Sequence, residues 1–383
     1  MKKQWHTAAV VLAIAFITGF NITGIMPVLS MISEKYPEQS TSTVQLLQTI
    51  HYALLMAASL LVGVLSARFS KKKIVLAGVL MVGIFGFLPF FFDSFAVLMA
   101  CRILIGFGYG LASPMIAGVI AEFGAPEKQA GYMGLNVVGM GIGAMTGNLL
   151  GGILAGNGLR FFYLIYLLAF AGGTVILALL PDTPPAAKNK KGTLGLKPIV
   201  LFLSIMTFLH AMLINAYGTN ISMYISDRVS TDPQVSGIAT AVNAACAMCM
   251  GMLFSRVLNL FRKMTLPFAV FAAAAGFAAL LFIPGMPGIL IGSGLCGVSL
   301  SCFSAGGAYM VMVSVSPEEV AGANGIYGVF NSLGGLIAPL VLGKAAMQMG
   351  GNTPENQFTA AMAGMLILTA AVAVHVTTSK ADR

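Results

Sequence analysis

The sequence predicts an all-α polytopic membrane protein with 12 transmembrane helices in two pseudo-symmetric six-helix bundles. Of its 383 residues, 58% are hydrophobic and only 9% are charged, whereas a soluble domain carries about a quarter charged residues. Many apolar runs reach the roughly twenty residues needed to cross about 30 Å of hydrocarbon. In addition, parts of the first half of the sequence recur in the second half.

The apolar runs, taken in order, predict twelve spans. Those of the first half are expected near residues 7–31, 45–67, 74–92, 96–121, 131–154 and 161–180. Those of the second half are expected near residues 198–224, 235–255, 265–284, 288–313, 322–346 and 357–377. The first run is too long for the apolar core of a signal peptide and no small-x-small cleavage site follows it, so it is interpreted as a span.

These spans divide the chain into three parts. They are an N-terminal six-helix bundle (1–180), a linker (181–197) and a C-terminal six-helix bundle (198–383). The linker is Pro-rich and basic, which is typical of a solvated connection.

Lys and Arg residues in the links between spans predict the orientation. With the N-terminus in the cytoplasm, the inner links hold sixteen of them and the outer links four, while Arg102 lies within a span. Because cytoplasmic links carry the excess of positive charge, both termini are expected in the cytoplasm, in a bacterial inner membrane. The net charge of +9 does not indicate nucleic-acid binding, since the basic residues form no amphipathic face.

A shift of 191 residues brings parts of the two halves into register. It places Pro126-Glu127 on Pro317-Glu318, Gly134 on Gly325, Gly143 on Gly334, Gly152 on Gly343, and Lys71-Lys72 on Arg262-Lys263. Two six-span repeats of the same sense are therefore expected.

The link after the second span carries a recognisable motif. It contains Gly63, Arg68, Lys71 and Lys72 in the spacing of GxLaDRxGRK, and it resembles a signature of the major facilitator superfamily. The resemblance implies that these residues form a conformational switch. Ala67 stands where the family has Asp, so a weaker cytoplasmic latch is expected. Topology alone would also select these basic residues, and that alternative stays open.

Spans four, five and eleven add glycine motifs. Arg102, Gly106 and Gly110 resemble the family's RxxxGxxxG signature, in which the matching arginine is linked to proton movement. Span five resembles the G-x8-G-x3-GP-x2-GG pattern of the twelve-span drug:proton antiporter branch, with Asn148 in place of Pro. The residues concerned, with those of the repeat, are Gly134, Gly143, Gly147, Gly151, Gly152, Gly325, Gly334, Pro339 and Gly343. Such stripes let helices approach closely and slide, although ordinary helix packing uses them too.

Ionisable side chains inside spans are costly and are therefore functional candidates. Arg102, His51 and His210 lie within predicted spans, and Glu122 lies where span four reaches the cytoplasm. Arg102 is expected to face a water-filled cavity, backbone carbonyls or an anionic substrate group, unless it is a structural arginine that caps a neighbouring helix. The two histidines could couple to protons or could be hydrogen-bonded packing residues.

Four uncharged polar residues complete the candidates for binding or coupling. These are Asn21 in span one and Asn215, Tyr217 and Asn220 in span seven. No acidic residue lies near the midpoint of any span. A cavity lined by Arg102 and histidines is therefore expected to accept anions or neutral amphiphiles and to repel cations.

Other classes of protein are disfavoured. The sequence has no HExxH or GxSxG motif, so neither an enzyme nor catalytic residues are expected. Cys246 and Cys249 form a CxxC without a second ligand pair, so neither a metal nor another cofactor is expected. A channel would keep the helices but would not need duplicated glycine stripes.

The resulting prediction is a secondary active transporter for a small amphipathic organic molecule, a drug-like compound or a metabolite. It would work by alternating access, as proton-coupled efflux. Uptake or exchange of a small organic anion is the alternative. The expected partners are the substrate, coupling protons and the bilayer, with the protein as a monomer.

Overall fold

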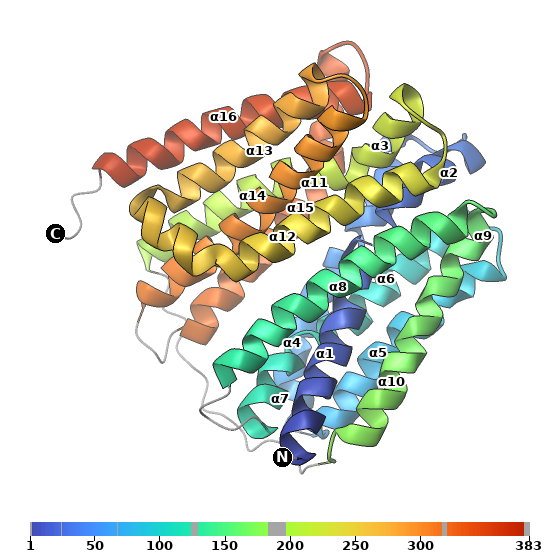
Figure 1. The fold of residues 1–383 in the computed structure, drawn as a ribbon, viewed down its shortest axis with the longest axis vertical. Coiled ribbons are helices and arrows are strands. Elements are labelled where there is room, and N and C mark those ends of the chain that lie inside the picture. Colours follow the sequence, from blue (N-terminus) through green and yellow to red (C-terminus); the bar gives the residue numbers. More distant parts are fainter. Residues whose placement is uncertain are drawn as a thin grey trace. The chain divides into compact units, whose positions relative to one another are not determined.

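The computed structural model describes residues 2–23, 25–66, 68–123, 129–182, 197–315 and 320–378, and within these ranges it is helical with no strand (Figure 1). This confirms the predicted all-α class. The elements of the first half are α1 (Lys2–Thr23), η1 (Met26–Val28), α2 (Leu29–Lys35), α3 (Thr41–Thr49), α4 (His51–Ser66), α5 (Lys71–Phe87), η2 (Leu88–Phe90), α6 (Phe95–Ala112), α7 (Met115–Phe123), α8 (Gln129–Ala155), α9 (Leu159–Phe162), η4 (Tyr163–Tyr166) and α10 (Leu167–Leu179). Those of the second half are α11 (Pro198–Arg228), α12 (Pro233–Phe261), η5 (Arg262–Met264), α13 (Thr265–Phe282), α14 (Gly285–Val313), α15 (Val320–Gln348) and α16 (Pro354–Thr378).

Ten helical runs of the described chain are long and apolar enough to cross a membrane. One of them, Pro233–Phe282, contains both α12 and α13 and so accounts for two predicted spans. The remaining predicted span, 45–67, is occupied by α3 and α4 together, neither of which has 18 residues. The described helices therefore occupy all twelve predicted span positions.

Several predicted spans are divided between helical elements, among them spans two and four. Span four (96–121) ends as α6 at Ala112 and resumes as α7 at Met115. Pro114 explains this break, because proline lacks the N–H that a continuous helix needs. Span two (45–67) is divided at Ile50, where the sequence offers no helix breaker.

The chain divides into two compact units. Unit 1 comprises Met1–Ser40, Leu46–Lys190 and Asp232–Ala241, and unit 2 comprises Thr41–Gln45, Lys191–Thr231 and Val242–Arg383. Thr41–Gln45 is thus part of unit 2, although the residues on both sides of it belong to unit 1. Asp232–Ala241 is part of unit 1, although the residues on both sides of it belong to unit 2. Residues 183–196, most of the predicted linker, lie outside the described part of the chain.

Glycines set the spacing of the helices in both units, and they do so at equivalent positions. A Cβ on Gly143 would lie 2.1 Å from the carbonyl oxygen of Phe16, and one on Gly334 would lie 2.2 Å from that of Phe208. These glycines are 191 residues apart, so α1 packs on α8 in unit 1 as α11 packs on α15 in unit 2. The sequence repeat therefore corresponds to a repeated backbone contact.

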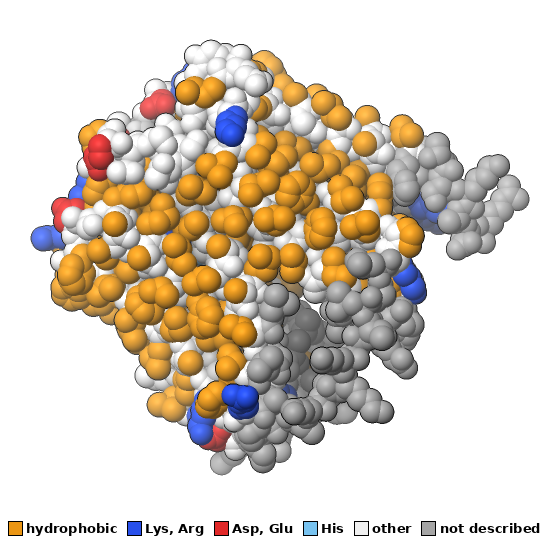
Figure 2. Space-filling model, turned by 180° about the vertical axis from the view of Figure 1, so that it is seen from behind, with side chains coloured by type: hydrophobic (Ala, Val, Ile, Leu, Met, Phe, Trp, Pro, Cys, Tyr) orange, Lys and Arg blue, Asp and Glu red, His pale blue; other side chains and the backbone are white. Residues whose placement is uncertain are grey.

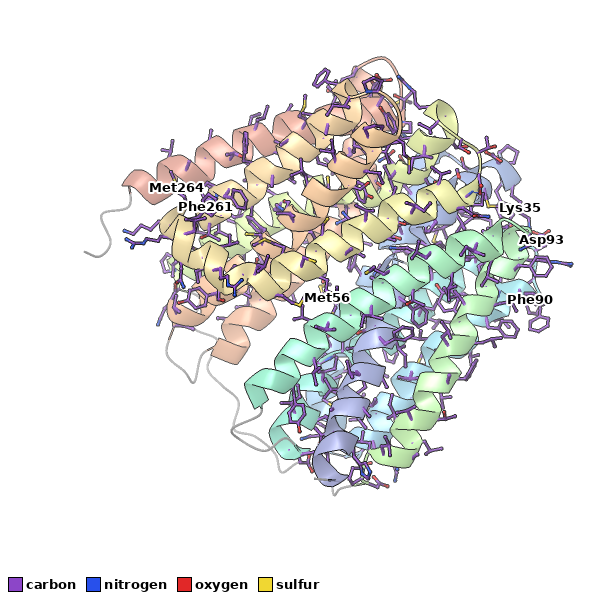
Figure 3. All side chains as sticks on the ribbon, viewed as in Figure 1. Lys35, Met56, Phe90, Asp93, Phe261 and Met264 are labelled. Atoms are coloured by element: carbon purple, nitrogen blue, oxygen red, sulfur yellow. The ribbon has the colours of Figure 1, made fainter. Side chains whose placement is uncertain are left out.

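The surface is suited to lipid. Figure 2 shows apolar side chains over most of the visible face, with the few described charged side chains at its margins. Many large apolar residues are exposed, among them Leu260 at 76% and Ile367 at 72%. Figure 3 places Lys35, Asp93 and Phe90 at one end of unit 1, where Lys35 and Phe90 end two apolar runs and Asp93 lies outside them.

Candidate functional site

Arg102 is buried inside unit 1. Only 1% of it is exposed, its Nε donates a hydrogen bond to the carbonyl of Leu47 at 2.8 Å, and its Nη1 donates one to the hydroxyl of Tyr166 at 3.2 Å. Leu47 lies in the last turn of α3, where carbonyls lack partners in their own helix. The arginine thus contacts one backbone carbonyl, at the end of a neighbouring helix, and one tyrosine hydroxyl.

One edge of the same guanidinium is left open. Nη2 of Arg102 is buried and has no hydrogen-bond partner, and the arginine forms no ion pair with any described residue. Buried charges in proteins are normally paired or fully hydrogen-bonded. This open edge makes Arg102 a candidate for contact with something other than the protein.

His51 lies one helical turn beyond Leu47, beside Arg102. A Cβ on Gly106 would lie 2.0 Å from the carbonyl oxygen of His51, so α4 and α6 are in close contact at this level. His51 is fully buried, its ring packs on Tyr52 at 4.3 Å, and neither ring nitrogen makes a hydrogen bond of acceptable geometry.

Asn21 and Asn148 extend this set of buried polar groups in unit 1. Both residues are fully buried, and neither side-chain amide has a hydrogen-bond partner. Phe20, which precedes Asn21, contacts the ring of Tyr166 at 5.6 Å. Asn148 was not among the predicted binding or coupling residues. Its place within the glycine stripe, where the family pattern has proline, was the available signal.

Lys71 and Glu122 form an ion pair at the end of unit 1 that contains Arg68 and Lys72. Their Nζ and Oε2 atoms are 2.5 Å apart, and Nζ also donates to the carbonyl of Gly118 at 3.0 Å. The structure thus supplies Lys71 with an acid from α7, which the sequence argument based on Ala67 did not foresee. Arg68 is exposed and Lys72 half-buried, and the surroundings of Gly63 lie outside the described part of the chain.

His210 is buried within unit 2. Its Nε2 lies 3.0 Å from the Oγ of Ser299, and its ring stacks on Phe303 at 4.0 Å with an interplanar angle of 8°. These contacts match the packing alternative and leave a coupling role as a proposal.

A closed ring of three amides lies elsewhere in unit 2. Gln45 donates to the Oδ1 of Asn220 at 2.6 Å, Asn220 donates to the Oε1 of Gln357 at 2.8 Å, and Gln357 donates to the Oε1 of Gln45 at 3.0 Å. All three side chains are fully buried. Of these, the sequence singled out only Asn220, because Gln45 and Gln357 lie near predicted span ends.

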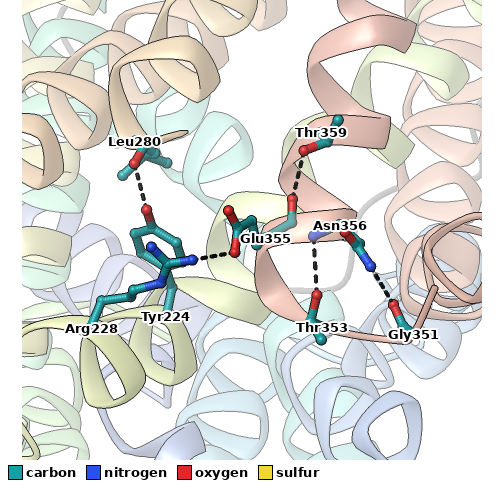
Figure 4. Close-up of polar contacts among 8 residues, drawn as sticks. All are labelled: Tyr224, Arg228, Leu280, Gly351, Thr353, Glu355, Asn356 and Thr359. Atoms are coloured by element: carbon teal, nitrogen blue, oxygen red, sulfur yellow. Dashed lines mark hydrogen bonds and ion pairs between the residues drawn. The ribbon is translucent and has the colours of Figure 1, made fainter. Parts of the chain in front are cut away.

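The other predicted polar residues of span seven are held within unit 2. Asn215 donates to the carbonyl of Ala211 in its own helix at 2.7 Å, and Tyr217 is 3% exposed. Near the end of α11, Tyr224 donates to the carbonyl of Leu280 and Arg228 pairs with Glu355 (Figure 4). The span-seven candidates therefore do not gather in one binding surface.

The predicted rocker glycines differ in their surroundings. Gly147 and Gly152 pack against backbone atoms as Gly143 and Gly334 do, and Gly151 is buried. By contrast, a Cβ on Gly325 would meet nothing within 4 Å. In unit 2, a Cβ on Gly343 would lie 2.5 Å from the Oγ of Ser42, which donates to the carbonyl of Pro339 at 3.3 Å. The surroundings of Gly134 lie outside the described residues.

Three titratable groups interact where the apolar runs of unit 1 end. Lys35 lies 2.6 Å from Asp93, and the hydroxyl of Tyr36 donates to Asp93 at 2.8 Å. The hydrogen bond from Lys35, followed by that from Tyr36, lowers the pKa of the Asp93 carboxyl. Burial and then the hydrogen bond to Asp93 raise the pKa of Tyr36 to about 12. The described residues contain no cluster of side chains that could hold a metal ion.

Comparisons with known proteins agree on the family and fold. A family model described as Major Facilitator Superfamily matches residues 11–202 and 203–381. The chain is 24% identical over 297 residues to the quinolone resistance protein NorA of Staphylococcus aureus (strain MSSA476), covering 73% of this chain and 75% of that protein. It is 27% identical over 175 residues to a multidrug resistance protein B homolog of Mycobacterium tuberculosis (strain CDC 1551 / Oshkosh), covering 45% of this chain and 31% of that protein.

Two solved structures show the same fold. A bacterial homolog of the human lysosomal transporter Spinster, solved in an inward-facing and occupied conformation, superposes with a TM-score of 0.80 at 15% identity, covering 100% of this chain and 98% of that one. The nucleoside transporter NupG (D323A mutant) superposes with a TM-score of 0.77 at 13% identity, covering 95% of this chain and 99% of that one.

Proposed function

The chain belongs to the Major Facilitator Superfamily, and we propose that it exports a small amphipathic organic molecule, a drug-like compound or metabolite, by proton-coupled alternating access. The similarity to a quinolone resistance protein along 73% of the chain carries this proposal. The buried polar groups of unit 1, Asn21, His51 and Arg102, supply side chains at depth that could contact a substrate or a proton.

The same proposal includes the place and orientation of the protein. The sixteen Lys and Arg residues in one set of links, against four in the other, favour both termini in the cytoplasm of a bacterial inner membrane. The repeated glycine contacts in each unit support six-helix bodies that move as wholes during transport. The working unit is proposed to be a monomer with no catalytic group.

Uptake or exchange of a small organic anion is the second candidate. It is favoured by Arg102, whose buried positive charge has no acidic partner among the described residues. A reversible carrier follows the gradients that are imposed on it, so direction is decided by experiment.

The test is transport by purified protein in proteoliposomes under an imposed pH gradient, with a panel of cationic, neutral and anionic amphiphiles. Accumulation that depends on the gradient and is lost in Arg102→Ala would support the primary proposal. Lys344→Ala, which removes an exposed positive charge instead of a buried one, is the matched control and should retain transport. Anion movement that is independent of the pH gradient would favour the second candidate. No movement of any member of the panel would contradict both.

A further inference from the structure

The internal repeat supplies an equivalent of the Arg102 site in unit 2. Gly297 lies 191 residues after Gly106, and a Cβ on it would be 2.1 Å from the carbonyl oxygen of Asn243, as one on Gly106 would be 2.0 Å from that of His51. The residue four positions before each glycine, one turn away on the same helix face, is Arg102 in unit 1 and Ser293 in unit 2.

The unit 2 position shows what this helix contact needs. The side-chain amide of Asn243 donates to the carbonyl of Ser293 at 2.9 Å, and both residues are buried and uncharged. The close approach of the two helices is therefore achieved there without any charge. The charge of Arg102 is not required by the packing that the two units share.

In unit 1 the equivalent position holds the charged guanidinium of Arg102, although one of its nitrogens has no hydrogen-bond partner. Nη2 of Arg102 carries two N–H donors, is buried, and has no acceptor among the described residues. The hydroxyl of Tyr166 accepts a hydrogen bond from the neighbouring Nη1, and the ring of Tyr166 contacts that of Phe20. Free donors of a guanidinium beside aromatic rings suit a ligand with an anionic oxygen group on an apolar body.

Resting on the proposed carrier function, we propose that the transported molecule bears an anionic oxygen group that pairs with Nη2 of Arg102. Carboxylate, sulfonate and phosphate monoester groups share this chemistry. Because Arg102 is 1% exposed in this structure, pairing takes place in a state of the cycle that exposes it. The assignment holds for export and for uptake alike.

Matched acid and amide probes test the assignment on the full-length purified protein. Dansylglycine and dansylglycinamide share a fluorescent apolar body and differ in the carboxylate, and three further aromatic acid and amide pairs widen the panel. We expect the acids to bind at least about tenfold more tightly than their amides, the scale of a charged hydrogen bond. Arg102→Gln should abolish this preference while amide binding stays, and Arg102→Lys should keep part of it.

Ser293→Ala is the control at the equivalent, uncharged position, and it should leave the acid preference unchanged. If Arg102→Gln does not fold, the ratio of acid affinity to amide affinity in the natural protein and in Arg102→Lys still tests the assignment. Equal binding of acids and amides by the natural protein, or an unchanged ratio in Arg102→Gln, would overturn the assignment. Proteoliposome transport of amides as fast as acids would do the same but leave the carrier proposal standing, whereas transport of no probe would count against both.

Discussion

One buried polar cluster in unit 1 and one in unit 2 differ in how fully their hydrogen bonds are satisfied. In unit 1, Arg102 keeps one guanidinium edge without a partner, and the amide of Asn21 has none. In unit 2, the ring of Gln45, Asn220 and Gln357 uses each amide once as donor and once as acceptor. A fully satisfied buried network fixes a structure, whereas an unsatisfied one marks a place where a partner can change. The difference separates a structural polar cluster from a functional candidate.

The largest effect is expected from substitutions at the glycine contacts that the two units share. Gly143→Ala and Gly334→Ala should each destabilise the protein by about 3 kcal/mol, because the new Cβ would meet a backbone carbonyl at 2.1 and 2.2 Å. The melting temperature of the purified protein in detergent measures this. Gly325→Ala, where the Cβ meets nothing, is the control and should be tolerated. A large loss in one unit only would contradict the repeat argument.

The second largest loss of stability is expected in the amide ring of Gln45, Asn220 and Gln357. Gln357→Leu leaves the Oε1 of Gln45 without its donor. It also removes one acceptor of Asn220, whose amide still donates to the carbonyl of Ala216 and the hydroxyl of Thr219, so a loss of about 1–3 kcal/mol is expected. Thermal unfolding in detergent, read by intrinsic fluorescence, measures it. Gln348→Leu changes an exposed glutamine and should have little effect. The double variant Gln357→Leu with Gln45→Leu should lose less than the sum of the two single variants, and strict additivity would argue against a coupled ring.

The ion pair between Lys71 and Glu122 should contribute less than the ring. Both side chains are partly exposed, at 21% and 31%, and such pairs typically stabilise by about 0.5–1 kcal/mol. Glu122→Gln should lower the melting temperature slightly at low salt and not at high salt, because salt screens exposed charges. Lys72→Ala, at the neighbouring residue, should not reproduce this salt dependence. An equal loss at both salt concentrations would point to packing and not to charge.

The smallest effect is expected at Asp93, outside the spans. The lowered pKa of its carboxyl means that the contacts with Lys35 and Tyr36 stabilise the fold above the unfolded-state pKa near 3.8. That contribution is lost as the pH falls through the lower, folded-state pKa. Asp93→Asn should therefore melt slightly earlier than the natural protein at neutral pH, and the difference should vanish in strong acid. Glu38→Gln, which changes another exposed carboxylate, is the control. If the difference in melting temperature between Asp93→Asn and the natural protein grew on acidification, the pKa of Asp93 would be shifted in the opposite direction.

Apolar run length and glycine spacing predicted the fold well, because they act locally along the chain. Twenty apolar residues must form a helix in lipid, since every backbone group has to be hydrogen-bonded within its own segment. The break at Pro114 could also have been anticipated from the missing N–H of proline. The division of span two at Ile50 could not, because no residue there disfavours a helix.

For the candidate site, the sequence found the buried charge but not its environment. It singled out Arg102 and His51, because ionisable groups are rare inside apolar runs. It did not single out Asn148, Gln45 or Gln357 as polar groups of interest, because an amide at a given position can be buried, exposed or paired. The sequence argument from Ala67 also predicted no acidic partner for Lys71, whereas the structure pairs Lys71 with Glu122 of α7.

The sequence by itself determined the class, the twelve passes, the repeat and the family, because these depend on composition and on spacing along one segment at a time. Only the tertiary structure decided which polar groups are satisfied. A hydrogen bond between Gln45 and Gln357 joins residues 312 positions apart, and no local pattern encodes such a distance. The open edge of Arg102 was likewise visible only once Leu47 and Tyr166 had taken its other donors.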